Sequence, residues 1–335
     1  MSKKTKLIAY FRLLRFHAGA SESILILLGA LLMGLRDIFS LFVLFFIGLF
    51  YHIYGYVLND YADIELDKKS VDLTKKPLVS GLIPKNHALF IIVSAAISTY
   101  ILTVIFFPYL ISIFLLSCAM ILAAIYDMYG KKIPGFSDFI IAGSLAFSFF
   151  FGASVVSLSF TSITLLVGLL TFVSIVFVNV VEGGLKDVDH DFLSGGKTLA
   201  TMLGVKVNEG RLIITKKFIG AAYGLIGMIC VVLLFLFMQP LVTLFDGLYI
   251  RLSLILFLLV IVFIVCYRLL HLPVFDRSKI KRLYSIINGL AGAGLFIIIY
   301  PLLGVEVLVI LLALPVTWYV LFNMALYGKP LQPDI

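Results

Sequence analysis

Two short segments of the sequence gather acidic residues at spacings that suit metal chemistry. The first, residues 59–67, reads Asn-Asp-Tyr-Ala-Asp-Ile-Glu-Leu-Asp. Residues three or four apart share a face of a helix, so Asp60, Asp63 and Asp67 line one side, with Asn59 beside them. Three carboxylates on one stripe repel one another unless a cation lies among them. Hard oxygen ligands of this kind favour Mg²⁺, which commonly takes one or two carboxylates plus substrate phosphates.

The second segment, residues 182–191, reads Glu-Gly-Gly-Leu-Lys-Asp-Val-Asp-His-Asp. Asp187 and Asp191 are again four apart, whereas Asp189 would point elsewhere on a helix. The two glycines could interrupt such a helix. Alone, this pattern is typical of an ordinary charged loop. Because it follows a predicted span on the same membrane face as the first segment, we predict that the two segments together hold metal and a diphosphate.

The elements that position these segments are predicted to be helices in lipid. The 335-residue chain is 62% hydrophobic and 13% charged, with a mean hydropathy of +1.15. Soluble domains carry about 25% charged residues. A spanning helix needs roughly 20 apolar residues, and a membrane barrel needs alternating apolar and polar residues. The runs here are continuously apolar, so the predicted fold class is an all-α, polytopic transmembrane bundle.

Ten spans are predicted, and the basic residues orient them. They lie at about 18–35, 39–58, 87–107, 109–126, 139–156, 161–181, 218–238, 248–270, 283–301 and 305–326. With this arrangement 24 of the 26 lysines and arginines fall on one side, and only Arg36 and Arg251 fall on the other. Cytoplasmic loops carry such an excess. The expected location is therefore the cell membrane, with both termini and both acidic segments cytoplasmic.

The cysteines, the first apolar run and the placement of the basic residues indicate the domain organisation and the kind of partner. The three cysteines lie in apolar runs, so no disulfide framework is expected. The first apolar run lacks a clear cleavage site and is interpreted as a retained span. Basic charge spread over one membrane face suits anionic headgroups and phosphates, so membrane lipid rather than nucleic acid is the expected partner. We expect one transmembrane domain, 1–335, with catalytic loops at about 59–86 and 182–217.

The motifs resemble those of the UbiA superfamily of intramembrane prenyltransferases. The superfamily's NDxxDxxxD signature is matched at every fixed position of the first segment. An RPLxSG-like element is matched at 76–81, with lysine where arginine is usual, and a YSxxLK element is matched at 126–131 in its tyrosine and lysine only. The second segment resembles the DxxxDxxxGxxTL form, through Asp187, Asp191, Gly195, Thr198 and Leu199.

This resemblance implies nine helices around a central cavity, so a tenth span is a departure. It implies an enzyme in which Mg²⁺ bridges the diphosphate of an isoprenyl donor between the two acidic faces. The implied catalytic residues are Asp60, Asp63, Asp67, Asp187 and Asp191, and the same five with Asn59 are the implied metal ligands. The implied substrate-binding residues are Asn59, Lys76, Tyr126, Lys131 and Lys186.

Less specific features of the sequence bear on the acceptor substrate and on whether the chain is a transferase or a transporter. The second segment resembles the quinone-type branch, so we expect a lipophilic aromatic or quinone-precursor acceptor, with geranylgeranylglyceryl phosphate as the alternative. A secondary transporter is the alternative of another class, but transporters place coupling acids near the bilayer midplane. No obligatory protein partner is evident. Glu22 and His17 are ionisable groups near the first span, so they either face the acceptor or lie at the interface.

Overall fold

A computed structural model describes most of the chain. The described residues are 3–68, 71–130, 133, 135–189, 191, 198–243 and 247–330. Within them the chain is almost entirely helical, and the one sheet is a two-stranded hairpin. The all-α fold class predicted from the sequence is confirmed.

Nine helices in the described part of the chain are long and apolar enough to cross a membrane. They are α3 (Ile38–Ala62), α5 (Lys85–Phe106), α6 (Leu110–Tyr129), α7 (Ser137–Ser154), the span Ser162–Lys186, α12 (Lys216–Phe237), α14 (Leu248–Leu270), α15 (Arg277–Leu303) and α16 (Val305–Tyr327). Each matches a predicted span to within six residues at either end. The chain is therefore a multi-pass membrane protein.

The first predicted span, 18–35, differs from the structure. The helix there, α2 (Ala20–Leu32), has only 13 residues, so it rises about 20 Å. It is preceded by α1 (Lys3–Leu13) and the short 3₁₀ helix η1 (Phe16–Ala18), and the two helical stretches meet at a bend of 49°. The chain has ten spans only if this bent pair crosses as one.

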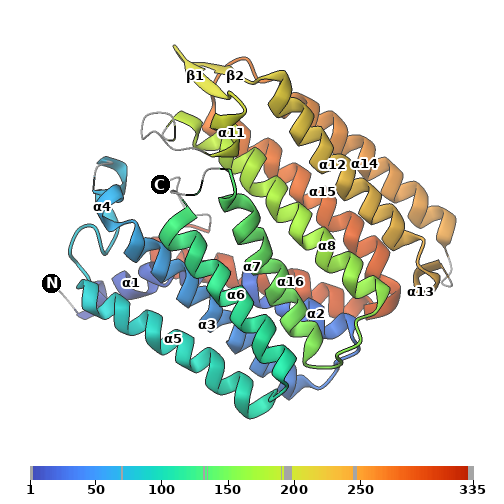
Figure 1. Ribbon diagram of the computed structural model, residues 1–335, viewed down its shortest axis with the longest axis horizontal. Helices are drawn as coiled ribbons and strands as arrows, with labels where there is room; N and C mark the ends of the chain where they lie inside the picture. The colour runs from blue at the N-terminus through green and yellow to red at the C-terminus, as the bar shows by residue number, and fades with distance from the viewer. Residues whose placement is uncertain are drawn as a thin grey trace. The chain divides into compact units, whose positions relative to one another are not determined.

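The chain divides into two compact units, each described by itself. Unit 1 comprises Met1–Met128, Phe147–Phe160 and Val309–Ile335, and unit 2 comprises Tyr129–Ala146 and Thr161–Leu308. In unit 1, α3 packs against α2 and α5, which lie beside it in Figure 1. Two short helices follow α3, namely α4 (Ile64–Asp67) and η2 (Val71–Lys75).

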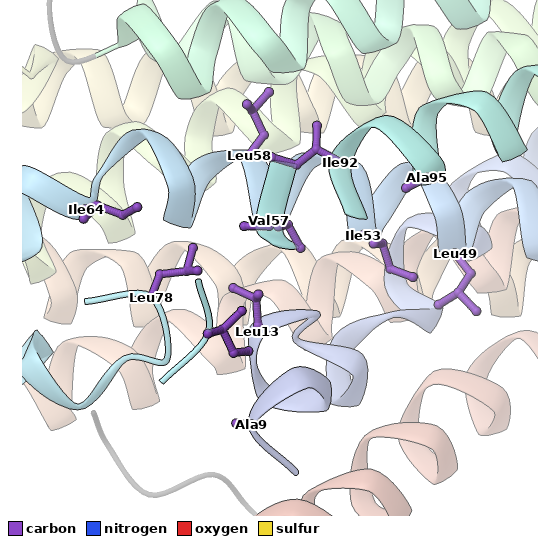
Figure 2. Packing of buried hydrophobic residues seen from close by; sticks show 12 residues of the cluster. Ala9, Leu13, Leu49, Ile53, Val57, Leu58, Ile64, Leu78, Ile92 and Ala95 are labelled. Carbon is purple, nitrogen blue, oxygen red and sulfur yellow. The ribbon is translucent and has the colours of Figure 1, made fainter. Parts of the chain in front are cut away.

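The core of unit 1 forms where α1, α3 and α5 meet. Figure 2 shows Leu13 of α1, Val57 of α3 and Ile92 of α5 among its buried side chains. Two further members, Ile64 and Leu78, come from the segment that follows α3. Burying a large aliphatic side chain stabilises a fold by about 1.5–3 kcal/mol relative to water, and these two contacts fix the segment against the helices.

Glycines allow α2 to approach its neighbours at backbone distance. A Cβ on Gly152 of α7 would lie 1.9 Å from the carbonyl oxygen of Ile26, and one on Gly48 of α3 would lie 2.5 Å from the Cα of Ser23. Small residues permit such close helix packing in membranes, where the hydrophobic effect does not drive association. Helix α2 is therefore held tightly although it is short.

Unit 2 is built on a second set of helices. Helix α8 (Ser162–Phe177) packs against α12, and α14 packs against α15 (Figure 1). The chain continues from α8 through a π-helix, η4 (Val178–Gly183), into α9 (Gly184–Lys186). Short helices α11 (Leu199–Met202) and α13 (Pro240–Thr243) lie on either side of α12 in the sequence.

A β-hairpin lies between α11 and α12. Strands β1 (Lys206–Asn208) and β2 (Arg211–Ile213) pair antiparallel. The two loop residues, Glu209 and Gly210, both have positive φ, as a type I′ turn requires. The Gly210 carbonyl accepts a hydrogen bond from the Phe275 amide, so the hairpin is tied to the chain just before α15.

Candidate metal and diphosphate site

The first acidic segment continues the helical course of α3. Asp63 is the C-cap of α3 and the N-cap of α4, and its carbonyl accepts a hydrogen bond of 2.8 Å from the Asp67 amide. The helix is therefore nearly unbroken from Ile38 to Asp67. Asp60 and Asp67 are 5% and 4% exposed, whereas Asp63 is half-buried. Burying two carboxylates is costly unless cations accompany them.

Lys76 supplies one of those cations and shows that Asp60 and Asp67 share a face. Its Nζ lies 3.0 Å from Asp60 Oδ1 and 2.7 Å from Asp67 Oδ2. Burial lowers the pKa of Lys76, but the two carboxylates outweigh that effect, so its pKa lies above the ordinary lysine value. The lysine therefore stays charged and joins the two acids.

Arg15 supplies a second cation to the same oxygen. Its Nη2 lies 2.9 Å from Asp60 Oδ1, and its guanidinium carbon lies 4.8 Å from the centroid of the Tyr56 ring. From the sequence, Arg15 was only one of the basic residues that orient the spans in the membrane. No local pattern reveals its role, because the turn between α1 and η1 brings it to a residue 45 positions later.

Asn59 is oriented by a carboxylate from another helix. Its Nδ2 donates a hydrogen bond of 3.0 Å to Asp127 Oδ1 of α6. This bond directs the amide nitrogen of Asn59 towards Asp127. The carbonyl oxygen of Asn59 is thereby turned away from Asp127 and is placed to act as a hard oxygen ligand. Asp127 stands where the YSxxLK element has serine, and that departure was the available signal for it.

The other substrate-binding candidates of unit 1 lie on the same elements. Lys76 begins a turn in which the Ser80 amide donates to its carbonyl at 2.9 Å and Gly81 has a positive φ of 73°. Leu78 anchors this turn in the core (Figure 2). Tyr126 is half-buried in α6, next to Asp127. Lys131 lies outside the described residues.

The second acidic segment follows the π-helix rather than a regular helix. The Asp191 amide donates to the Asp187 carbonyl at 2.9 Å, so these two aspartates are one helical turn apart. The glycines do not stop the chain from coiling. A Cβ on Gly184 would lie 2.6 Å from that of Ala200, so a larger residue there would displace α11.

Asp189 is held by an arginine that the sequence analysis did not single out. Arg277, the first residue of α15, binds both Asp189 oxygens through Nη2 at 2.9 and 3.1 Å. Its Nε donates to the Lys186 carbonyl at 3.1 Å. The Lys186 ammonium lies 3.4 Å from Asp187 Oδ2. Arg277 therefore fixes the segment. It pairs with Asp189, the aspartate that was expected to point away from Asp187 and Asp191.

A further carboxyl lies near the second segment. Asp138, in the first turn of α7, is only 9% exposed and interacts electrostatically with Asp191. Each acidic segment is thus accompanied by an additional acid, Asp127 in unit 1 and Asp138 in unit 2. Asp127 lies within the 126–131 element and Asp138 follows it by seven residues, so this element is the feature in the sequence that could have indicated them.

The residues present fit a magnesium ion that a substrate helps to hold. In the described part of the chain, no three aspartate, glutamate, histidine or cysteine side chains converge closely enough to enclose a metal unaided. Mg²⁺ rarely uses such cages and is usually bound by one or two carboxylates plus phosphates. Asp60 and Asp67 supply hard oxygen donors of that kind on one face, with Arg15 and Lys76 balancing their charge. The Asn59 carbonyl oxygen is a further donor of the same chemistry in this segment.

The two acidic segments belong to different units. Asp60, Asp67 and Lys76 come together in unit 1, where Asn59 is bonded to Asp127. Their counterparts in unit 2 are Lys186, Asp187 and Asp191, which lie along one short stretch of chain. The approach of one segment to the other stays a prediction.

Family and sequence comparisons match this chain to known prenyltransferases. The model of the UbiA prenyltransferase family matches residues 23–271. A digeranylgeranylglyceryl phosphate synthase of Saccharolobus solfataricus is 26% identical over 45% of this chain and 52% of its own length. A 4-hydroxybenzoate octaprenyltransferase of Francisella tularensis subsp. novicida is 32% identical over 44% and 51%. These matches span about half the length of the curated relatives.

Solved structures share the fold at low sequence identity. A digeranylgeranylglyceryl phosphate synthase aligns with a TM-score of 0.67 and 21% identity over 89% of this chain and 99% of that one. A UbiA homologue from Archaeoglobus fulgidus, bound to GPP and Mg²⁺, aligns with a TM-score of 0.61 and 15% identity over 87% and 99%. A homologue from Aeropyrum pernix K1 gives 0.63 and 13% over 84% and 98%.

Proposed function

Because the chain belongs to the UbiA prenyltransferase family, we propose that it transfers an isoprenyl group from a prenyl diphosphate to a lipophilic acceptor in the membrane. One observation carries this proposal. Asp60, near the end of α3, and Asp67, in α4, are both buried and share the ammonium group of Lys76. Hard oxygen donors and cations at one place suit a metal diphosphate.

The position of these acids favours a transferase over a transporter. Asp60 and Asp67 lie at the end of α3 and in α4, whereas coupling acids of transporters lie near the bilayer midplane on broken helices. The solved homologue bound to GPP and Mg²⁺ supports a donor of this class. The proposed metal ligands are Asn59, Asp60, Asp63, Asp67, Asp187 and Asp191.

The chain's own residues have two tasks towards the donor. The carboxylates and the Asn59 oxygen would hold the metal that accompanies the diphosphate, and Arg15 and Lys76, which lie beside Asp60, would contact the phosphate oxygens. Arginine presents a planar fork to phosphate, whereas lysine acts as a point charge. Arg15 thus provides the fork that Lys76 lacks. Bound Mg²⁺ supplies Lewis-acid polarisation of the leaving diphosphate.

The second segment completes the site in this proposal. Asp187 and Asp191 would serve as further metal ligands, and Lys186, with Lys131 and Tyr126 from the preceding element, would contact the donor. Departure of diphosphate leaves an allylic cation, which a dry pocket protects from water. Aromatic faces stabilise such cations by about 0.5–2 kcal/mol each, and tyrosines flank both the first segment and the 126–131 element.

For the acceptor we propose an aromatic or quinone-precursor compound. The spacing of the second segment and the likeness to a 4-hydroxybenzoate octaprenyltransferase support it. Geranylgeranylglyceryl phosphate is the second candidate, because relatives in Saccharolobus solfataricus and Sulfurisphaera tokodaii are named as synthases of its prenylated product. The charge distribution supports a cytoplasmic position in the cell membrane for both acidic segments and both termini.

Purified protein with Mg²⁺, labelled geranylgeranyl diphosphate and a panel of acceptors tests the function. We expect diphosphate release together with a labelled product from one acceptor class. A 4-hydroxybenzoate product and a glyceryl-phosphate product distinguish the two candidates. Background release of diphosphate with every acceptor would remove the donor assignment.

A further inference from the structure

A carboxyl–imidazole hydrogen bond joins two membrane-embedded helices and involves none of the acids assigned to the metal. Glu22 of α2 and His52 of α3 meet at 2.7 Å between Oε2 and Nδ1. The His52 side chain is fully buried and that of Glu22 is 14% exposed. Ionisable groups inside a membrane are costly and are usually functional. The proposed reaction does not use either residue directly.

The second ring nitrogen of His52 is also bonded. Its Nε2 lies 3.2 Å from the main-chain carbonyl oxygen of Arg15. A carbonyl only accepts, so Nε2 must carry a hydrogen, whichever partner holds the proton shared with Glu22. Glu22 thereby fixes the orientation of the ring, and the ring donates to Arg15.

The bonded carbonyl belongs to a residue in an uncommon conformation. Arg15 has φ 43° and ψ 41°, in the left-handed region that residues other than glycine seldom adopt. It lies at the break between α1 and η1, and its carbonyl also accepts the Ala18 amide at 2.8 Å. Such conformations persist only where surrounding contacts determine them, and they gather at functional sites.

One stripe of α3 provides those contacts. His52, Tyr56 and Asp60 are spaced four residues apart, so they share a face of the helix. His52 holds the Arg15 carbonyl, the Tyr56 ring lies under its guanidinium at 4.8 Å, and Asp60 binds that group at 2.9 Å. The rings of His52 and Tyr56 are 4.4 Å apart. The backbone and the side-chain end of Arg15 are therefore held by the same stripe.

We infer that Glu22 and His52 are positioning residues that hold Arg15 in its left-handed turn and so set its guanidinium on the first acidic segment. This inference rests on the proposed function, because the guanidinium serves there as a ligand for the anionic diphosphate of the donor. Glu22 and His52 act through Arg15 and do not contact the donor.

Two variants of His52 separate positioning from packing. Glutamine at His52 retains a nitrogen donor near Nε2, whereas His52→Leu keeps bulk and loses the donor. We expect His52→Leu to raise KM for geranylgeranyl diphosphate by about tenfold, as loss of an orienting partner commonly does, with a smaller effect on kcat. We expect His52→Gln to stay close to wild type.

A matched control removes a different bond between the same helices. Ser23, next to Glu22, donates to the Phe45 carbonyl at 2.9 Å. Ser23→Ala should leave KM unchanged even if it lowers Tm. Calorimetric binding of inorganic pyrophosphate with Mg²⁺ provides a second readout that needs no acceptor. His52→Leu should weaken that binding by about the same factor as it raises KM.

A double-mutant cycle decides whether His52 acts through Arg15. In an Arg15→Ala background, His52→Leu should cause no further loss of pyrophosphate affinity. An equal loss in both backgrounds, or an unchanged affinity in the single variant, would overturn the inference while leaving the proposed function intact. If wild type itself neither binds pyrophosphate nor releases it from the donor, both the proposed function and this inference are wrong.

Discussion

The two acidic segments use the same spacing but are built differently. In the first, Asp60 and Asp67 are nearly inaccessible on a continuous helix and are neutralised by Arg15 and Lys76. In the second, the Asp187 side chain is 45% exposed and its ion pair with the adjacent lysine is 3.4 Å long. In that segment the arginine, Arg277, pairs with Asp189 and not with Asp187 or Asp191. Spacing thus indicates which acids share a face, whereas packing determines which of them already have cations.

We interpret the first segment as the half of the site whose buried acids are paired with cations before the donor binds. In the second, Asp187 is partly open to solvent although Arg277 fixes the neighbouring backbone. The predictions below test this contrast, starting with the change expected to have the largest effect.

Removal of divalent cations should abolish prenyl transfer, because both acidic segments depend on metal. We expect EDTA to reduce prenyl transfer to background, because neither segment can bind a diphosphate against its own negative charge. Added Mg²⁺ should restore turnover. Product formation that continues unaltered under chelation would contradict a magnesium mechanism.

Single neutral substitutions should be nearly as severe in either half. Asp63→Asn and Asp187→Asn are each expected to abolish turnover while leaving membrane insertion intact. Detergent-extracted protein with an unchanged elution profile provides the control for folding. Full activity in either variant would remove that aspartate from the site.

Loss of the Arg277 clamp should affect the second half specifically. Arg277→Met removes the bonds to Asp189 and to the Lys186 carbonyl. We expect the Mg²⁺ concentration for half-maximal activity to rise about tenfold, as for other lost orienting partners. Asp189→Asn should have a smaller effect, because the carbonyl bond survives. Unchanged metal dependence in Arg277→Met would show that the clamp is only structural.

Asp127 offers the corresponding test in the first half. Asp127→Leu frees the Asn59 amide to rotate, and we expect apparent Mg²⁺ affinity to fall by about tenfold. Asp127→Asn retains a carbonyl that can accept from Asn59 and should lose less. Tyr54→Phe removes another bond between α3 and α6, from the Tyr54 hydroxyl to the Met120 carbonyl, and serves as the control. An equal loss in all three variants would indicate helix packing.

The exposed acid of the first segment should matter least. The pKa of Glu65 is lowered by its bonds to Lys68 and, next, to Lys85, each 3.0 Å long. A lowered folded-state pKa stabilises the protein above the ordinary carboxyl pKa, and this contribution is lost as pH falls through the lowered value. Wild type and Glu65→Gln should thus differ slightly in Tm at neutral pH and converge in acid. Turnover should not change.

Much of this architecture was predictable from the sequence because its determinants are local. Long apolar runs specified the spanning helices to within six residues at either end. Helical spacing placed Asp60 and Asp67 on one face and Asp187 one turn from Asp191, because the chain coils through both segments. These features depend on residues close together along the chain.

The partners that were missed depend on contacts distant in sequence. Arg15 reaches Asp60 only through a left-handed turn at a break between helices, and Asn59 meets Asp127 only because α3 and α6 lie together. Arg277 and Asp189 are 88 residues apart. The 49° bend before α2 was also missed, because hydropathy measures the apolar run and does not show where the backbone bends.

The most direct test of the central claim is anomalous diffraction from crystals grown with Mn²⁺ and a non-hydrolysable prenyl diphosphate. We predict metal peaks on one pyrophosphate, with carboxylate oxygens of Asp63 and Asp187 on opposite sides of it. Metal bound to one segment alone would contradict the account. So would two segments that open toward opposite faces of the bilayer.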